Sequence, residues 1–212
     1  MKITVIGGSG FLGSHVADCL RSRKNKVVIF DKKKSKYLKN NQKMVVGDIS
    51  KINQLRKAIK GSDVVYHFAG ISDIGESIKK PSETAKINII GTANVLRLCN
   101  EYNIKRIIFA STIYVSSRQG GFYRVSKQAC ELMVEEYKKR FNLNYTIVRF
   151  GSIYGDRANN FNTIQNFIRN AVAEKKILRK SNGREVRNFI NVKDVSKICF
   201  QIVKKKYINK YF

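Results

Sequence analysis

Tyr123 and Lys127 are four positions apart, in a stretch whose apolar residues recur at helical spacing. On a helix, both side chains lie on the same face. A free tyrosine has a pKa of about 10 and is a poor base at neutral pH. A neighbouring ammonium stabilises the phenolate and lowers this pKa, so Tyr123 can take a proton from a substrate hydroxyl while hydride leaves the same carbon. Taken alone, such a spacing is more often a surface pair.

Two hydroxyl residues precede this pair in the chain. Ser111 and Thr112 directly follow a predicted strand over residues 105–110. The C-terminal end of a parallel strand lies at the edge of the sheet where ligands bind. Thr112 can therefore hold the reacting oxygen of a substrate, although hydroxyls at strand ends also serve as plain hydrogen-bonding groups.

A glycine-rich turn near the start of the chain indicates a second kind of chemistry. Gly7, Gly10 and Gly13 follow a predicted strand and open a predicted helix. Glycines allow a tight turn and a close approach to a pyrophosphate, and the helix N-terminus offers free N–H groups and a positive dipole. The alternative is a plain turn rich in glycine, but strand, turn and helix stand in the order that dinucleotide binding requires.

Asp31 follows the second predicted strand, 18 residues after Gly13. A carboxylate at this position accepts hydrogen bonds from the ribose hydroxyls of an adenosine. The lysines at positions 32–34 can meet a 2′-phosphate instead. A carboxylate repels that phosphate, and we therefore expect NAD as the cofactor rather than NADP.

Strands and helices alternate along the first 150 residues, which predicts an α/β fold with a Rossmann-type, doubly wound parallel sheet. We expect strands over residues 2–6, 27–30, 44–46, 63–68, 105–110 and 145–150, and helices over residues 11–23, 52–60, 81–102 and 122–141. Beyond residue 150 the pattern loosens into helices over 161–175 and 193–204 and an extended segment over 185–192. We expect an NAD-binding domain over 1–150 and a reduced substrate-binding part over 151–212.

Composition narrows the class of protein. The chain has 212 residues and a formal net charge of +27. Its basic residues are spread along the chain, and charge alone indicates non-specific attraction to anions, so no specific nucleic-acid partner is expected.

Neither a signal peptide nor a membrane-spanning run is visible, which predicts a cytoplasmic protein. The four cysteines show no metal-ligand spacing, and no metal site is expected. His15 and His67 have no nucleophile or metal partner nearby in the pattern and are interpreted as structural.

Taken together, these motifs resemble the extended short-chain dehydrogenase/reductases, specifically the NAD-dependent epimerase/dehydratase family that acts on nucleotide sugars. Further motifs occur in the order of that family, namely Gly47-Asp48-Ile49, His67-Phe68-Ala69-Gly70, the segment from Asn88 to Thr92, the segment from Arg149 to Gly155, and the segment from Arg187 to Val195. The resemblance covers nearly the whole chain.

The resemblance implies a role for each matching residue. It implies cofactor binding by Gly7, Gly10, Phe11, Leu12, Gly13, Asp31, Asp48, Ile49, Phe68, Ala69, Gly70, Ser111, Tyr123 and Lys127. Tyr123, Lys127 and Thr112 would be catalytic, while Thr112, Ser152 and Arg187 would contact the substrate, with Arg187 meeting its diphosphate. The family also implies a homodimer through helices 81–102 and 122–141.

Several positions depart from the family pattern. Tyr123 follows Thr112 by only 11 positions, where the family has a longer loop on the substrate side. Ser152 stands where members acting on nucleotide sugars usually have Asn. Ile113 and Tyr114 replace the Asp-Glu pair of the 4,6-dehydratases, which argues against that branch. Members also continue beyond the position of Phe212, so a reduced substrate-binding part is expected.

The leading hypothesis is an NAD-dependent nucleotide-sugar epimerase of the UDP-glucose 4-epimerase kind. Tyr123 would act as the base, and a transient ketone would accept hydride back on its other face. A nucleotide-sugar dehydrogenase or reductase of the same fold is the alternative enzyme. The alternative from another class is a dinucleotide-binding protein without turnover, or one half of a split enzyme.

Overall fold

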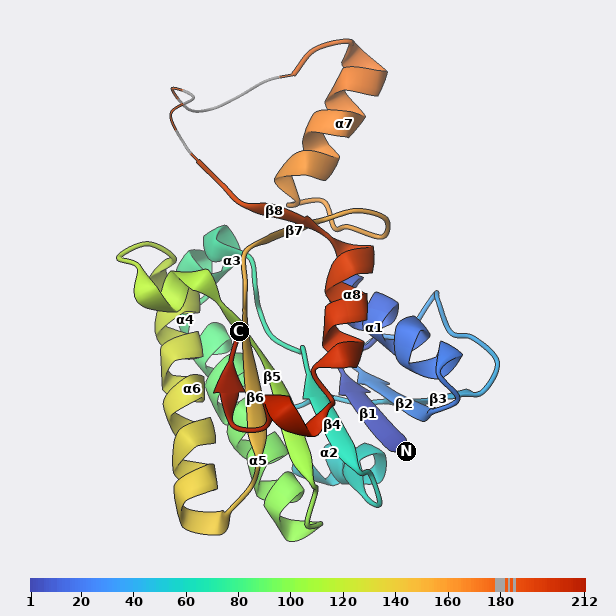
Figure 1. Cartoon of the computed structure of the whole chain (residues 1–212). Helices are drawn as coiled ribbons and strands as arrows, with labels where there is room; N and C mark the ends of the chain where they lie inside the picture. Colours follow the sequence, from blue (N-terminus) through green and yellow to red (C-terminus); the bar gives the residue numbers. More distant parts are fainter. Residues whose placement is uncertain (178–181, 183, 185) are drawn as a thin grey trace.

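The centre of the molecule is a seven-stranded sheet in the order β3-β2-β1-β4-β5-β6-β9. All neighbouring strands in it are parallel (Figure 1). The computed structural model describes residues 1–177, 182, 184 and 186–212. The strands are β1 (Lys2–Ile6), β2 (Lys26–Asp31), β3 (Gln42–Val46), β4 (Val64–His67), β5 (Arg106–Thr112), β6 (Tyr145–Phe150) and β9 (Lys210–Tyr211). The predicted Rossmann-type fold is confirmed.

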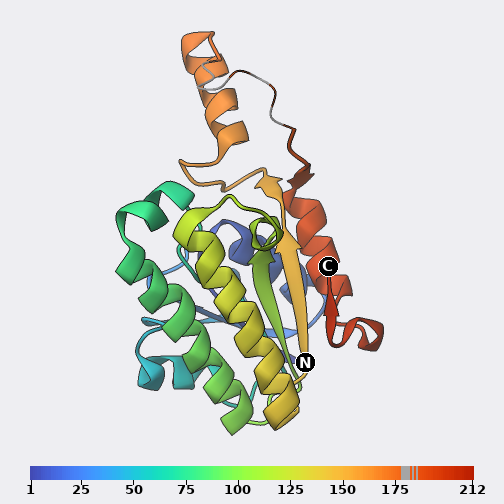
Figure 2. The ribbon, with the colours of Figure 1, turned by 90° about the vertical axis from the view of Figure 1, so that its left-hand side faces the viewer.

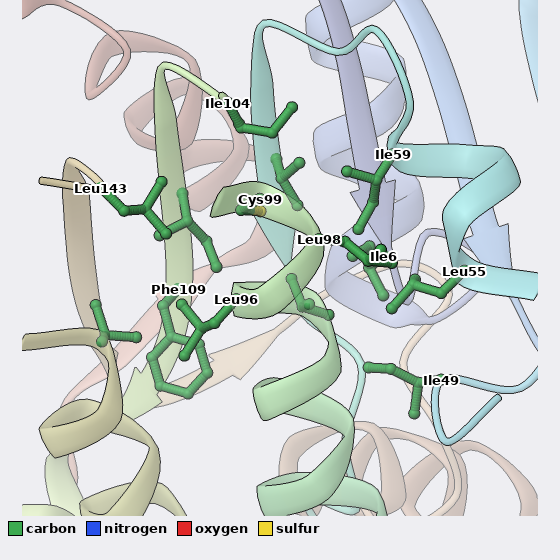
Figure 3. Close-up of a cluster of buried hydrophobic side chains, with 14 of the residues drawn as sticks. Ile6, Ile49, Leu55, Ile59, Leu96, Leu98, Cys99, Ile104, Phe109 and Leu143 are labelled. Atoms are coloured by element: carbon green, nitrogen blue, oxygen red, sulfur yellow. The ribbon is translucent and has the colours of Figure 1, made fainter. Parts of the chain in front are cut away.

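Helices cover both faces of the sheet because its central strands are apolar on both sides. On one face, α1 (Phe11–Ser22) and α8 (Val192–Gln201) pack over Val5, Ile29 and Ile108. On the other face lie α2 (Ile52–Ile59), α5 (Gly91–Glu101) and α6 (Gly121–Phe141). Figure 2 shows α5 and α6 side by side in front of the sheet. Figure 3 shows part of the buried cluster between these helices and the sheet, including Ile6 and Phe109.

The predicted helix over residues 81–102 is helical throughout but irregular. It consists of α4 (Pro81–Thr84), a π-helical turn η1 (Ala85–Ile90) and α5. A further short helix, α3 (Ile74–Lys79), precedes it and was missed by the sequence analysis. Six residues are too few for a visible apolar period, and the only local signal is Asp73, whose carboxylate accepts a hydrogen bond from the N–H of Glu76 at 2.7 Å.

The long helix α6 buries only part of the apolar stripe that its sequence predicts. Of this stripe, Val125 and Leu132 are 48% and 63% exposed, whereas Met133 packs against the core. Tyr123 and Lys127 lie on the buried face of the same helix. An apolar stripe usually indicates the core-facing side of a helix, and on α6 that interpretation holds for only part of the stripe.

Residues beyond 150 form two structural groups. A two-stranded sheet of β7 (Ser152–Tyr154) and β8 (Phe189–Asn191), with α7 (Thr163–Glu174), projects from the body in Figure 1. Helix α8 returns to pack on α1, and β9 pairs with β6. Residues 192–212 thus pack with the predicted NAD-binding domain, and a functional division at residue 150 stays a prediction. Of the extended segment predicted over 185–192, residue 185 lies outside the described residues.

Membrane association and metal binding can both be examined in the described part of the chain. No helix in it combines the length and the apolarity needed to cross a membrane. All four cysteines are free thiols, and three of them are buried. In the described residues, no cluster of His, Cys, Asp and Glu side chains could hold a metal ion.

His67 ties the end of β4 to α5. Its ring is fully buried, and its Nε2 lies 2.9 Å from Thr92 Oγ1. Burial, with a smaller contribution from the positive charge of Lys127, lowers the pKa of His67 to about 3. His67 is therefore neutral in the folded protein, in agreement with a structural role.

This neutral histidine predicts a pH dependence of stability. In the unfolded chain His67 binds a proton below a pKa of about 6.5, whereas in the folded chain it does not until near pH 3. The contribution of His67 to the free energy of unfolding is therefore fully present above about pH 6.5, and it is lost as the pH decreases toward 3. Between about pH 7.5 and pH 5, His67 alone should remove about 2 kcal/mol from the free energy of unfolding. Urea unfolding of wild type and His67→Gln measures this, and equal pH slopes in the two proteins would contradict it.

Candidate functional site

A cavity of about 590 Å³ opens at the carboxyl edge of the sheet, where the strand order reverses between β1 and β4. This is the place where doubly wound folds bind their ligands. Its lining includes every residue that the sequence analysis assigned to the cofactor, namely Gly7, Gly10, Phe11, Leu12, Gly13, Asp31, Asp48, Ile49, Phe68, Ala69, Gly70, Ser111, Tyr123 and Lys127. The fold thus brings into one cavity residues that are up to 120 positions apart in the sequence.

The glycine turn leaves no room for side chains at two of its positions. Gly7 has φ +82, and a Cβ there would lie 2.5 Å from the backbone nitrogen of Ala69. A Cβ on Gly13 would lie 2.2 Å from the Gly7 carbonyl oxygen. Only glycine permits the turn to close this tightly against the loop after β4. The N-terminus of α1 thereby faces the cavity directly.

The residues present fit a dinucleotide. Within the described chain, no side chain caps α1, and its first turn carries no acidic residue. The free N–H groups and the positive end of this helix are therefore available to a pyrophosphate. Ser111, in the cavity lining, has a buried hydroxyl without a hydrogen-bond partner among the described residues. A buried hydroxyl left unpaired is costly, and a bound polar ligand would satisfy it.

Two carboxylates lie at the adenosine end that the sequence predicts. Asp31 accepts hydrogen bonds from the N–H of Ser9 at 3.0 Å and of Lys33 at 3.2 Å. These bonds fix its carboxylate beside the glycine turn, and each oxygen keeps a free lone pair for a ribose hydroxyl. Asp48 accepts from the N–H of Ser50 at 2.7 Å. This hydrogen bond is the main reason why the pKa of Asp48 is lowered, so the group is ionised at neutral pH.

Tyr123, Lys127 and Thr112 lie together in the cavity lining and are all buried. Tyr123 and Lys127 come from the buried face of α6, and Thr112 is the last residue of β5. The ammonium of Lys127 donates to the carbonyl of Ala110 at 2.8 Å and lies 4.7 Å from the ring centre of Phe109. The predicted pairing of a phenol with a hydroxyl and an ammonium in one cavity is therefore present in the structure.

The protonation of these groups differs from what the spacing alone suggests. Sequence analysis expects Lys127 to lower the pKa of Tyr123. Burial instead raises this pKa to about 12, with a hydrogen bond to Thr112 acting in the opposite direction. Burial also lowers the pKa of Lys127. The expected direction is wrong for the protein alone, because burial is the largest influence on the pKa of Tyr123. The ammonium of Lys127 is hydrogen-bonded to the carbonyl of Ala110.

Asn88 holds the loop below the cavity. It lies in η1, and its side-chain amide exchanges hydrogen bonds with the backbone of Ile71, which donates at 2.8 Å and accepts at 3.0 Å. Its Nδ2 also lies 2.9 Å from the hydroxyl of Ser126, which in turn donates to the carbonyl of Tyr123 at 2.8 Å. One buried amide thus joins the loop after β4 to the turn of α6 that carries Tyr123 and Lys127.

Two predicted substrate residues do not line the cavity. Arg187 is exposed just before β8, and Ser152 is the first residue of β7, flanked by lining residues Gly151 and Ile153. Conversely, the lining contains residues that the sequence analysis did not assign, among them Phe30, Lys32, Ile71, Ser72, Asp73, Glu76, Glu83, Tyr114, Phe150, Asn159, Phe161 and Asn162. Tyr114 could have been found from its place two residues after Thr112. The residues at 159–162 carry no local signal of this kind.

Comparisons with known proteins agree with this geometry. The model of the NAD dependent epimerase/dehydratase family matches residues 3–210. The chain belongs to the NAD-dependent epimerase/dehydratase family. Its cofactor is NAD, as the family description states and as the cavity lining fits.

Relatives in this family are named for different reactions. A UDP-N-acetyl-alpha-D-glucosaminuronate decarboxylase of Bacillus cytotoxicus is 31% identical, over 91% of this chain and 68% of the relative. A dTDP-D-glucose 4,6-dehydratase of Dictyostelium discoideum is 28% identical, over 97% of this chain and 56% of the relative. The crystal structure of UDP-glucose 4-epimerase from Thermotoga maritima with UDP-glucose superposes with a TM-score of 0.92 at 26% identity, covering 100% of this chain and 76% of that one.

The hydrogen bonds of Asn88 to Ile71 and Ser126 predict a measurable loss of stability when this side chain is removed. Asn88→Ala leaves the N–H and carbonyl of Ile71 unpaired in a buried place, and it should lower the free energy of unfolding by about 3 kcal/mol. It should also weaken NAD binding, because the loop at 68–71 lines the cavity. Asn94→Ala in α5 is the control, since Asn94 makes one part-buried hydrogen bond, at 3.1 Å to the carbonyl of Ile49. Urea unfolding measures the loss of stability, and calorimetry with NAD measures the loss of affinity. Equal losses in the two variants would contradict this role of Asn88.

Proposed function

We propose that this chain is an NAD-dependent nucleotide-sugar epimerase of the UDP-glucose 4-epimerase kind. The observation that carries this proposal is the placement of Tyr123, Thr112 and Lys127 in the same cavity as the glycine turn. Ile113 and Tyr114 follow Thr112, where a 4,6-dehydratase of the resembled family carries a carboxyl pair. A site without those acids favours reversible oxidation of one alcohol over elimination of water.

The proposed chemistry assigns one role to each side chain. NAD, when bound, supplies the acceptor and donor of hydride. Tyr123 takes the proton from the sugar hydroxyl as it becomes a ketone and returns that proton when the ketone is reduced on its other face. Thr112 holds the same oxygen by a hydrogen bond. Lys127 provides a positive charge behind the site and a donor for a ribose hydroxyl.

A second candidate function is favoured by a specific observation. Arg187, the group expected to meet the substrate diphosphate, is exposed and absent from the cavity lining. A cavity that holds NAD and whose described lining does not include Arg187 fits a dinucleotide-binding protein without turnover, or half of a split enzyme. A dehydrogenase or reductase of the same fold would use the same three residues, but the dehydrogenase would release reduced cofactor and the reductase would consume it.

The first test removes the two catalytic groups separately. Tyr123→Phe should lower the conversion of UDP-glucose to its epimer by about 100-fold or more while NAD stays bound, as expected for loss of a general acid–base group. Lys127→Met should lower both the rate and the affinity for NAD. Tyr137→Phe and Lys139→Met, on the same helix but outside the cavity, are matched controls. Product analysis by chromatography and calorimetry with NAD provide the two measurements.

Three outcomes of this test separate the candidate functions. If wild type turns over and Tyr123→Phe is equally active, the proposed mechanism is wrong. Wild type that binds NAD without converting any nucleotide sugar supports the non-catalytic function. Stoichiometric accumulation of reduced cofactor, seen by its absorbance, supports the dehydrogenase.

We also propose that two copies associate through α5 and α6, as the family resemblance implies. The support is the exposed apolar stripe of α6, with Phe122, Val125 and Leu132 each about half exposed or more, and Ile90 at 53% on the neighbouring turn. Exposed apolar groups gathered on one helix face are typical of an interaction surface. A two-fold arrangement would cover the same stripe on both copies.

A single charge placed on this stripe tests the dimer. Leu132→Glu should convert the dimer to a monomer in sedimentation at micromolar concentration, because a carboxylate would be buried without a partner. Lys139→Glu introduces the same residue at an exposed position near the end of α6 and should leave the dimer intact. A wild-type chain that sediments as a monomer would refute the proposal directly.

A further inference from the structure

Arg157 occupies an unusual position between β7 and α7. Its side chain is only 19% exposed, and its backbone has φ +66, a left-handed conformation that arginine rarely adopts. Gly155, two residues earlier, has φ +133, and a Cβ there would lie 2.8 Å from Val192 Cγ1. A backbone held in such conformations persists only where surrounding contacts enforce it.

The contacts of Arg157 reach two other parts of the molecule. Its NH2 donates to Asp18 of α1 at 2.9 Å, and its guanidinium lies 4.3 Å from the ring centre of Tyr37. Asp18 also accepts a hydrogen bond from the side-chain amide of Gln42, at 3.2 Å. The half-buried carboxylate of Asp18 thus accepts from two donors, Arg157 beyond β7 and Gln42 at the start of β3.

Tyr37 lies within the loop that follows Asp31, and Gln42 is the first residue after this loop. The start of this loop is fixed to the glycine turn, because Ser9 donates its hydroxyl hydrogen to the carbonyl of Lys33 at 2.8 Å. Its end is fixed to β3, where Gln42 accepts from the N–H of Lys39 at 2.9 Å. The loop at 32–41 therefore connects the adenosine end of the cavity to the ring on which Arg157 stacks.

Arg157 belongs to the segment 155–162, which forms part of the cavity wall. Asn159, Phe161 and Asn162 of this segment line the cavity. His15 of α1 lies with its Nε2 at 2.8 Å from the carbonyl oxygen of Asp156, a second link to the helix whose N-terminus faces the cavity. Arg157 itself does not line the cavity.

We propose that Arg157 is a positioning residue that couples the loop at 32–41 to the segment at 155–162, so that binding of NAD orders the far wall of the cavity. NAD engages Asp31 and Lys32 at one end of this connection. Ordering of the loop fixes Tyr37 and Asp18, and these hold Arg157 and the lining residues next to it. A ligand that rigidifies one segment lowers the cost of ordering the other, which is a coupling of two binding regions through shared contacts.

Hydrogen exchange measured with and without NAD tests this coupling. In wild type, NAD should slow amide exchange both in the glycine turn and in residues 155–162. In Arg157→Gln, the glycine turn should still be protected, the protection of 155–162 should be lost, and NAD should bind about tenfold more weakly. Lys193→Ala is the matched control, because it breaks only the exposed Asp156–Lys193 pair of 3.3 Å on the same segment and should behave as wild type.

Two further variants keep the test decisive if Arg157→Gln does not fold. Tyr37→Leu removes the stacking ring but leaves the Asp18 pair in place, and it should reduce the protection of 155–162 by NAD. Arg157→Lys keeps the charge but loses the planar fork, and it should restore protection only in part. If Arg157→Gln or Tyr37→Leu binds NAD as wild type does and 155–162 is still protected, Arg157 is purely structural and the proposal is overturned. None of these readouts needs turnover, so failure of the proposed epimerase activity leaves the result interpretable.

Discussion

The side chain of Asn88 is the constraint on which the site depends. A π-helical turn places this amide where it bonds both to the backbone of Ile71 and to Ser126. Thr92 extends the network, because it donates to the carbonyl of Asn88 at 2.6 Å and lies beside His67. The loop below the cavity, the end of β4 and the turn of α6 that carries Tyr123 and Lys127 are therefore positioned together. Because every member is buried, a missing partner would cost more than the bond itself contributes.

The buried face of α6 carries polar and charged groups as well as apolar ones. Tyr123, Ser126, Lys127 and Glu131 are all buried on the side that meets the sheet, and Glu131 is satisfied by a two-point ion pair with Arg149 at 2.7 and 3.0 Å. Val134 packs into the core on the same face, while Phe122 and Leu132 stay exposed on the other side of the helix. Exposed apolar groups on one helix face are typical of an interaction surface, so the proposed association of two copies would use the side of α6 that the site leaves exposed.

Sequence analysis predicted most of this fold because its signals are local. The bounds of β1 and β6 agree with prediction, and Gly7, Gly13 and Asp31 were recognised from spacing that the turn geometry demands. What it missed depends on distant partners. β9 is two residues long and is defined only by pairing with β6. The burial of the polar side chains of α6 depends on distant partners such as Asn88, which donates to Ser126, and the place of Arg157 follows from Asp18, which is 139 positions away.

Burial acts on Tyr123 and Lys127 in opposite senses, and this bears on when the site can react. It raises the pKa of the phenol to about 12 and lowers that of the ammonium, so it favours the uncharged form of each. A phenolate in this cavity therefore needs additional positive charge or additional hydrogen bonds, and Thr112 supplies only one such bond. The nicotinamide ring of oxidised NAD carries a positive charge, although its two phosphates make the whole molecule anionic, so the bound cofactor would favour the phenolate where that ring lies near the phenol. Under the proposed function, proton abstraction by Tyr123 would then depend on the presence of the hydride acceptor, and the base would stay inactive until oxidation of the substrate can follow.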